Sequence, residues 1–276
     1  MKRLLCFSVF CLAMSMTTFA QAQTVDTTAV IHDFFETNEG NSGGESTALG
    51  RFSNTAFIVY NESVVNAAGI NTGDVLTGLS FRVDGTRDSP NFTVDNYVIR
   101  LGESLNSAGS LDDVFNDNVV GGALTTVRSG ALDFVAAEYD SATSTAINDI
   151  TVTANNFGPE ITFDSDYTYN GGDLLLLYSH TGPESLNGET VVTSRSDAFT
   201  RTFNADNSVE FEEQGVQSIF GEGFDATERG FGATGSGRFF APIVQFSVTQ
   251  AVPEPTSAAL LIGLGMIGVV NRRRKM

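Results

Sequence analysis

Residues 160–180 read EITFDSDYTYNGGDLLLLYSH, and this stretch decides the fold class. It holds two runs of strand-forming residues separated by Asn170-Gly171-Gly172-Asp173, a sequence typical of a β-hairpin turn. The four leucines from Leu174 to Leu177 leave no polar face, as expected of a strand that is buried on both sides. We therefore predict two strands joined as a hairpin, the second of them inside the fold.

Alternating apolar and polar residues predict further strands on both sides of this stretch. The segments are VLTGLSFRV (75–83), FTVDNYVIRLG (92–102), INDITVTA (147–154) and RFFAPIVQFSV (238–248). In the first segment, one face carries Val75, Leu79, Phe81 and Val83, and the opposite face carries Ser80 and Arg82. In the second, a change of parity indicates a bulge at Asp95-Asn96. In the fourth, Pro242 indicates an edge strand or a bulge.

Helical signals are weak, with one or two turns expected near Val64–Ala68 and near Leu111–Phe115. The sequence is rich in Thr, Val, Phe, Asn, Asp and Gly, and turn sequences recur between its short predicted strands. The predicted fold is all-β, an antiparallel β-sandwich or jelly roll that occupies residues 23–251.

The amino terminus has the form of a Sec-type signal peptide over residues 1–22. Lys2 and Arg3 precede an apolar run from Leu4 to Met16, and Ala20-Gln21-Ala22 has the pattern of a cleavage site. A first transmembrane helix is the alternative, but the run is short for one. We expect cleavage after Ala22 and export of the remainder.

The carboxyl terminus, residues 252–276, combines rigid, apolar and basic parts. Pro253 and Pro255 mark the start of a helix. The fourteen residues Ser257–Val270 would span ~21 Å as that helix, against a hydrocarbon core of ~30 Å. Arg272, Arg273, Arg274 and Lys275 form a basic stop that favours the cytoplasmic side. We therefore predict a short transmembrane helix with the main domain outside the cytoplasm; a buried core helix is the alternative.

This arrangement resembles the PEP-CTERM sorting signal of Gram-negative bacteria. The resemblance rests on Val252-Pro253-Glu254-Pro255, the apolar run, and the arginines that follow it. It implies that the tail is held in the inner membrane, recognised by an exosortase through Pro253, Glu254 and Pro255, and cut near them. It also implies delivery to the cell surface or to an extracellular polysaccharide matrix. A plain membrane anchor is the alternative.

The predicted domain is strongly acidic. Residues 23–251 hold nine basic residues, all arginine, against 32 acidic ones, a net charge of −23. Such a charge disfavours nucleic acid as a partner and keeps the domain soluble. The domain has no Cys or Lys, which excludes disulfides and covalent catalysis by either residue.

Catalytic and metal-binding patterns are weak. His32 and His180 are the only histidines and lie far apart in the sequence, which favours structural roles. Asp164 and Asp166 could in principle supply the carboxylate pair of a glycoside hydrolase. Oxygen ligands for Ca²⁺ gather at Asp164, Asp166 and Asp173, and also at Asp112-Asp113 and Asn116-Asp117-Asn118. Turn formation by the same Asp and Asn residues is the simpler interpretation.

Residues 163–182 also resemble the choice-of-anchor-type β-sandwich domains of other surface proteins. The matching residues are Phe163, Tyr167-Thr168-Tyr169, Gly171 to Leu175, and His180-Thr181-Gly182. This resemblance implies a sandwich fold and assigns no activity.

Three functions follow as hypotheses. The first is a structural or interaction protein of the cell surface or biofilm matrix, with the Sec machinery, an exosortase, the inner membrane and exopolysaccharide as its partners. The second is a carbohydrate-binding module supported by Ca²⁺. The third is a polysaccharide-acting enzyme. The first requires no cofactor and no catalytic residue.

Overall fold

The computed structural model describes residues 24–40, 42–44, 48–49, 53–83, 91–139, 153–182, 196–200, 215–228 and 240–251. Its residues fall into two compact units, Asp26–Gln250, here called the body, and the two chain ends, Met1–Val25 with Ala251–Met276. The expected signal peptide and transmembrane helix lie outside the described residues. Among the described residues, the body holds every helix and every strand residue except Thr24, Val25 and Ala251.

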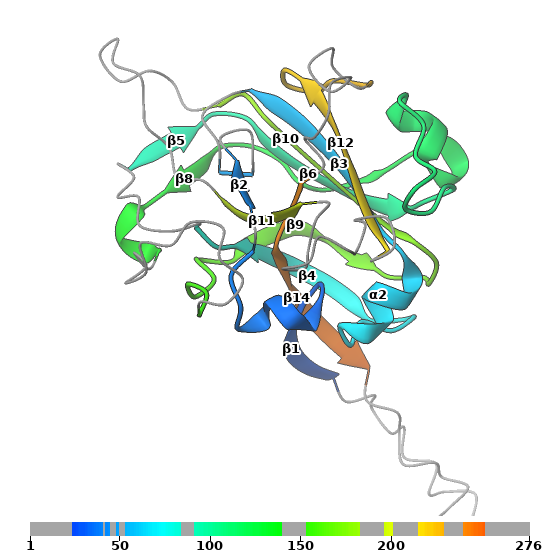
Figure 1. Ribbon diagram of the computed structural model, residues 1–276, viewed down its shortest axis with the longest axis horizontal. Helices are drawn as coiled ribbons and strands as arrows, with labels where there is room; N and C mark the ends of the chain where they lie inside the picture. The colour runs from blue at the N-terminus through cyan, green and yellow to red at the C-terminus, as the bar shows by residue number, and fades with distance from the viewer. Residues whose placement is uncertain are drawn as a thin grey trace, which may run out of the picture. The chain divides into compact units, whose positions relative to one another are not determined.

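Two antiparallel sheets make up most of the body, so the predicted all-β fold is confirmed (Figure 1). The five-stranded sheet has the order β12-β3-β10-β6-β7, and the four-stranded sheet has the order β1-β14-β4-β9. Their bounds are β12 (Val216–Glu222), β3 (Asn54–Tyr60), β10 (Leu174–His180), β6 (Tyr97–Glu103), β7 (Thr125–Arg128), β1 (Thr24–Val30), β14 (Val244–Ala251), β4 (Val75–Phe81) and β9 (Ile161–Thr168).

Smaller elements lie around these sheets. A three-stranded sheet holds β13 (Phe240–Pro242), β11 (Ser196–Thr200) and β2 (Ser42–Gly44), and a two-stranded sheet holds β5 (Phe92–Val94) and β8 (Leu132–Phe134). The helical elements are α2 (Glu62–Ala67), η1 (Asp33–Glu36), η2 (Phe115–Asn118), η3 (Val120–Gly122) and η4 (Ala136–Glu138).

The main core lies between the two large sheets. Alternate residues of β3, β10 and β6 face apolar residues of β4 and β14 in one buried cluster. Examples are Ile58 and Leu176 from the five-stranded sheet and Leu79 and Phe246 from the four-stranded sheet, all fully buried. At one margin β7 lies against β9, so the two sheets meet there as well. This arrangement is a β-sandwich.

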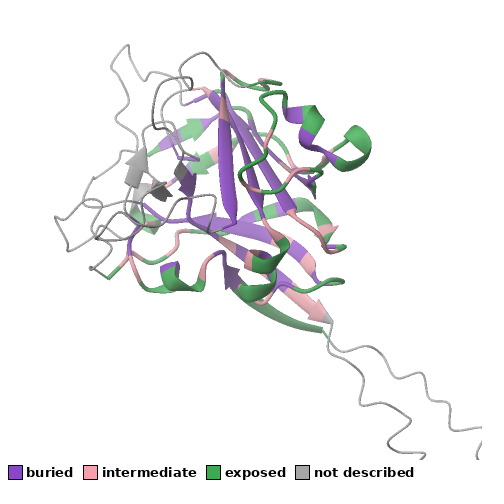
Figure 2. Cartoon of the chain, turned by 45° about the vertical axis from the view of Figure 1, so that its right-hand side comes forward, coloured by how far each residue is buried: buried purple, intermediate pink, exposed green. Residues whose placement is uncertain are grey.

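The central strand β10 is buried on both faces, as its four leucines predict. Leu174 and Leu176 belong to the core between the sheets, and Leu175 and Leu177 belong to a second cluster on the outer face. Phe115 and Val119, from the segment 104–124, cover that outer face, and the rings of Phe57 and Phe115 stack at 5.1 Å. Figure 2 shows the strands of this sheet as buried along most of their length.

The predicted hairpin at Asn170–Asp173 is wrong. β9 pairs with β4, whereas β10 pairs with β3 and β6, so the turn carries the chain from one sheet to the other. Gly171 and Gly172 have φ angles of 91° and 78°, a conformation that favours glycine, so the turn needs both glycines although it does not form a hairpin. The Asp173 carboxylate accepts hydrogen bonds from Glu62 N at 2.7 Å and from Ser107 Oγ at 2.6 Å. These contacts join the turn to α2 and to the segment 104–124, which covers the outer face of the five-stranded sheet, instead of to a partner strand.

Three local predictions need correction. The parity change at Asp95-Asn96 is a break between two strands, because β5 pairs with β8 while β6 pairs with β10 and β7. Near Leu111–Phe115 the helical turn begins only at Phe115, as η2. In β4 the pairing with β14 is irregular next to Gly78, so Leu76 instead of Val75 enters the core.

Other predictions are confirmed. α2 covers most of the turn expected near Val64–Ala68. Pro242 ends β13, which is the edge strand of its sheet, and the chain then enters β14 in the four-stranded sheet. Of the predicted strand 147–154, only Thr153 and Ala154 are among the described residues; Thr153 forms a bridge with Asn38.

Candidate functional site

The sorting segment begins where the body ends. β14 runs from Val244 to Ala251, and Val252, Pro253, Glu254 and Pro255 follow at once. These four residues, the basic stop Arg272–Lys275, and the cleavage residues Ala20 and Ala22 all lie outside the described residues. Within the described ranges, no helix has the length and apolar character needed to cross a membrane.

The first and last strands of the body are neighbours in one sheet. Ile31 N donates to Val244 O at 3.1 Å, and Thr249 Oγ1 donates to Asp26 Oδ1 at 2.7 Å. Because the low-numbered end of β1 meets the high-numbered end of β14, the two strands run antiparallel. The chain therefore enters the body and leaves it toward the sorting segment at the same end of one ladder.

The three acidic residues singled out for Ca²⁺ do not gather in one place. Asp164 and Asp166 are exposed on β9, and Asp164 Oδ2 accepts a hydrogen bond from Ser129 N at 2.9 Å. Asp173 lies in the turn to β10, where both carboxylate oxygens accept hydrogen bonds from the protein. Among the described residues, no group of three or more His, Cys, Asp and Glu side chains could hold a metal ion.

The oxygen-rich segment 112–118 organises its own backbone. Asn118 is fully buried; its Oδ1 accepts a hydrogen bond from Asp112 N at 2.7 Å, and its Nδ2 donates to Asp112 O at 2.9 Å. Gln217 of β12 also contacts the segment 104–124, because its Oε1 accepts a hydrogen bond from Gly109 N at 2.7 Å. These bonds match turn formation, the simpler of the two interpretations of this sequence.

The two histidines occupy separate structural positions. His180 ends β10, is 1% exposed, and accepts a hydrogen bond at Nδ1 from Gly182 N at 3.1 Å, while its ring stacks on that of Tyr97. His32 has a φ of 61° and precedes η1. Burial lowers the pKa of His32 because it penalises the charged imidazolium, and nearby Asp33 acts in the opposite direction.

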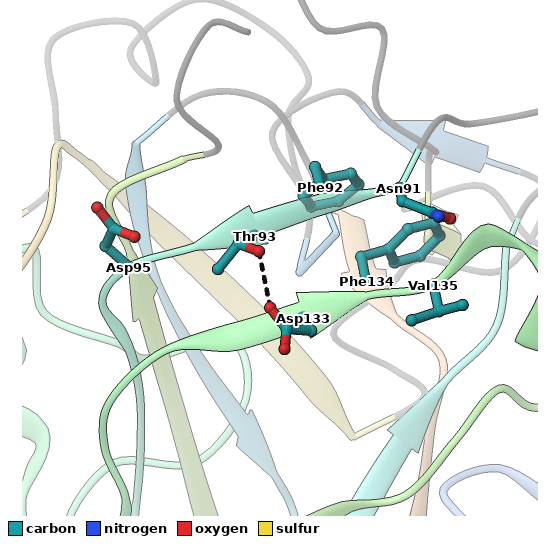
Figure 3. Close-up of a pocket in the computed structure, with 7 residues that line it drawn as sticks. All are labelled: Asn91, Phe92, Thr93, Asp95, Asp133, Phe134 and Val135. Carbon is teal, nitrogen blue, oxygen red and sulfur yellow. Dashed lines mark hydrogen bonds between the residues drawn. The ribbon is translucent and has the colours of Figure 1, made fainter.

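A hollow of about 420 Å³ lies along the β5–β8 ribbon, and its lining is more apolar than polar (Figure 3). Thr93 and Asp133 face each other across the two strands, and Thr93 Oγ1 donates to Asp133 Oδ1 at 2.7 Å. Phe92 and Phe134 stack at 4.6 Å and are 7% and 3% exposed. Exposed residues of the hollow therefore offer hydroxyl, amide and carboxylate groups, whereas its two phenylalanine side chains are largely buried.

A second hollow, of about 270 Å³, lies beside the loop that follows β12. Arg100 of β6 forms a salt bridge of 2.8 Å with Asp225, whose φ is 61°. Asp225 N donates to the buried Ser179 Oγ at 2.7 Å, which holds the loop against β10. Sequence reasoning missed this site; Asp in a glycine-rich stretch was the available signal, because Asp tolerates positive φ better than most residues.

One family matches part of the chain: the PEP-CTERM protein-sorting motif, over residues 251–275. No curated protein matches the chain. The match begins at the last residue of β14 and covers the motif, the apolar run and the basic stop. The chain therefore carries a PEP-CTERM protein-sorting motif, which marks it as an exported protein of Gram-negative bacteria that an exosortase processes.

Proposed function

We propose that the chain is a structural or interaction protein of the cell surface or extracellular matrix. After export by the Sec machinery, the apolar run Ser257–Val270 holds it in the inner membrane, and exosortase cleavage near Pro253–Pro255 then releases the body. The observation that carries this proposal is the sorting motif at residues 251–275. The strong negative charge of residues 23–251 supports it, because a released domain of this kind stays soluble and is repelled by anionic lipid.

Processing in the native host tests this proposal. We expect mass spectrometry of the surface-shed protein to find no peptide that contains Arg274, and an exosortase deletion to leave the full tail in the membrane fraction. Replacing Pro253, Glu254 and Pro255 with alanine should have the same effect as the deletion. Glu228→Ala, a change in the body, serves as the control and should be processed normally. An intact tail on shed wild-type protein contradicts the proposal.

A glycan-binding role is the second candidate, and the hollow on the β5–β8 ribbon favours it. Asp95 and Asp133 at its rim could accept hydrogen bonds from sugar hydroxyls. Glycan arrays probed with and without EDTA test this role and any need for Ca²⁺. If the hollow binds glycans, Asp95→Ala combined with Asp133→Ala should abolish the signal, while Asp164→Ala should not. No signal in either condition removes the candidate. We propose no catalytic role for the body.

A further inference from the structure

β14 is the last strand of the body and also a central part of its core. It lies between β1 and β4 in the four-stranded sheet. Val244, Phe246 and Val248 are at most 1% exposed and belong to the core between the sheets. The body therefore cannot give up β14 as a whole without losing its core, and only the end of the strand can open on its own.

The sorting motif leaves no spacer between itself and this strand. Pro253 is two residues beyond Ala251, and two residues of polypeptide reach at most ~7 Å. A processing enzyme needs backbone that is accessible and free of sheet pairing, and cleavage follows the population of the open form when opening is fast. Pairing at the end of β14 therefore competes with access to the motif.

Two side-chain hydrogen bonds hold the end of β14 in place. Thr249 Oγ1 donates to Asp26 Oδ1 of β1 at 2.7 Å. Gln250 Nε2 donates to Gly69 O, in the loop that precedes β4, at 2.8 Å. The last residue of β14 paired with β4 is Thr249, opposite Val75, so these two bonds act where the ladder is already ending.

We propose that the end of the β1–β14 ladder is a gate on sorting: exosortase reaches its motif only when residues 249–251 leave the sheet, and the Asp26–Thr249 and Gly69–Gln250 bonds set how often they do. This inference rests on the proposed exosortase processing. It makes the folded body, beyond the motif itself, a determinant of the processing rate. It also makes Asp26, near the beginning of β1, a part of the gate.

Pulse–chase measurement of tail loss from the full-length protein in the native host tests the gate. Asp26→Ala and Gln250→Ala should each accelerate processing by about twofold to tenfold, the effect of removing one modest hydrogen bond. Ser107→Ala removes a comparable hydroxyl–carboxylate bond, to Asp173 at 2.6 Å, and should leave the rate unchanged. A Gly-Ser spacer inserted between Ala251 and Val252 should accelerate processing and abolish the effect of Asp26→Ala.

A disulfide across the β1–β14 ladder tests whether holding the gate closed slows processing. Asp26→Cys combined with Thr249→Cys places two thiols across the ladder, and the periplasm favours their oxidation to a disulfide. We expect at least a tenfold slower loss of the tail, with each single cysteine variant near the wild-type rate or faster. Equal rates in all variants, with processing still dependent on exosortase, overturn the gate. Wild-type protein that loses its tail without exosortase, or never loses it, overturns the proposed function and the gate together.

Discussion

Arg82 follows directly after β4, and its side chain is fully buried. Its guanidinium donates to Phe35 O at 2.6 Å and to Asn38 O at 2.5 Å, and it lies over the ring of Phe157. Alternation along residues 75–83 places Arg82 on the polar face, opposite to Phe81 and Val83, but it does not predict that this arginine is buried. The planar, multidentate guanidinium donates to two carbonyl groups in and just after η1. Arg82 is therefore a structural residue of the body.

Arg82→Met should lower the free energy of unfolding by about 2–5 kcal/mol, because the buried carbonyl of Phe35 and the partly buried carbonyl of Asn38 each lose a donor. Arg100→Met is the matched control. Its salt bridge with Asp225 is partly exposed, so its loss should cost no more than about 1 kcal/mol. Denaturant unfolding followed by circular dichroism measures both, and equal effects of the two changes would contradict the assigned role.

At the scale of elements, β10 shows what local sequence can and cannot predict. The apolar run Leu174–Leu177 predicts a strand that is buried on both faces, and the structure confirms it. The preceding sequence Asn170–Asp173 predicts a turn, and the chain has positive φ angles there, at Gly171 and Gly172. It does not identify the partner strands, because a turn fixes local backbone angles whereas pairing depends on packing of distant residues. β10 consequently joins β3 and β6 and leaves β9 to the other sheet.

Because β10 is buried on both faces, truncating a leucine on either face should destabilise the body. A strand with one exposed face would be sensitive on its buried face alone. Leu175→Ala on the outer face and Leu176→Ala on the inner face should each lower the free energy of unfolding by about 2–5 kcal/mol. Leu105→Ala is the control, since Leu105 is 67% exposed and its truncation should change stability by less than about 0.5 kcal/mol. A small effect for Leu175→Ala alone would mean that the segment 104–124 does not cover the sheet in solution.

At the scale of the whole molecule, burial of the tyrosines links folding to alkaline pH. Burial raises the pKa of all six tyrosines, to about 12 for Tyr139 and Tyr169. For Tyr60, Tyr97 and Tyr178 the pKa shift is larger, because burial penalises the charged form of these three most strongly. The unfolded chain releases these protons near the ordinary tyrosine pKa of about 10. It therefore binds fewer protons than the folded body above that pH.

Stability should accordingly be unaffected by these groups below pH ~10 and fall as pH rises further. We expect tyrosinate absorbance and loss of the β-sheet circular dichroism signal to appear in one coincident transition. The absence of Trp from the chain leaves the tyrosinate signal free of indole absorbance. Titration of most tyrosines near pH 10 with an intact circular dichroism spectrum would contradict their burial.

The sequence by itself determined the strands within residues 75–83, 92–102, 161–180 and 240–248, the two-sided burial of Leu174–Leu177, the edge position of Pro242, and the sorting motif. Each of these depends on the periodicity of side chains, on the restricted backbone of proline, or on the order of residues in a motif. All three can be read from a short stretch of sequence. Only the tertiary structure decided which strands pair, why Arg82 is buried, and where the Asp candidates lie. It also brought Asp26 within 2.7 Å of Thr249, 223 residues later in the chain. Such proximity arises from burial of a shared core, a property of the whole chain that no short window contains.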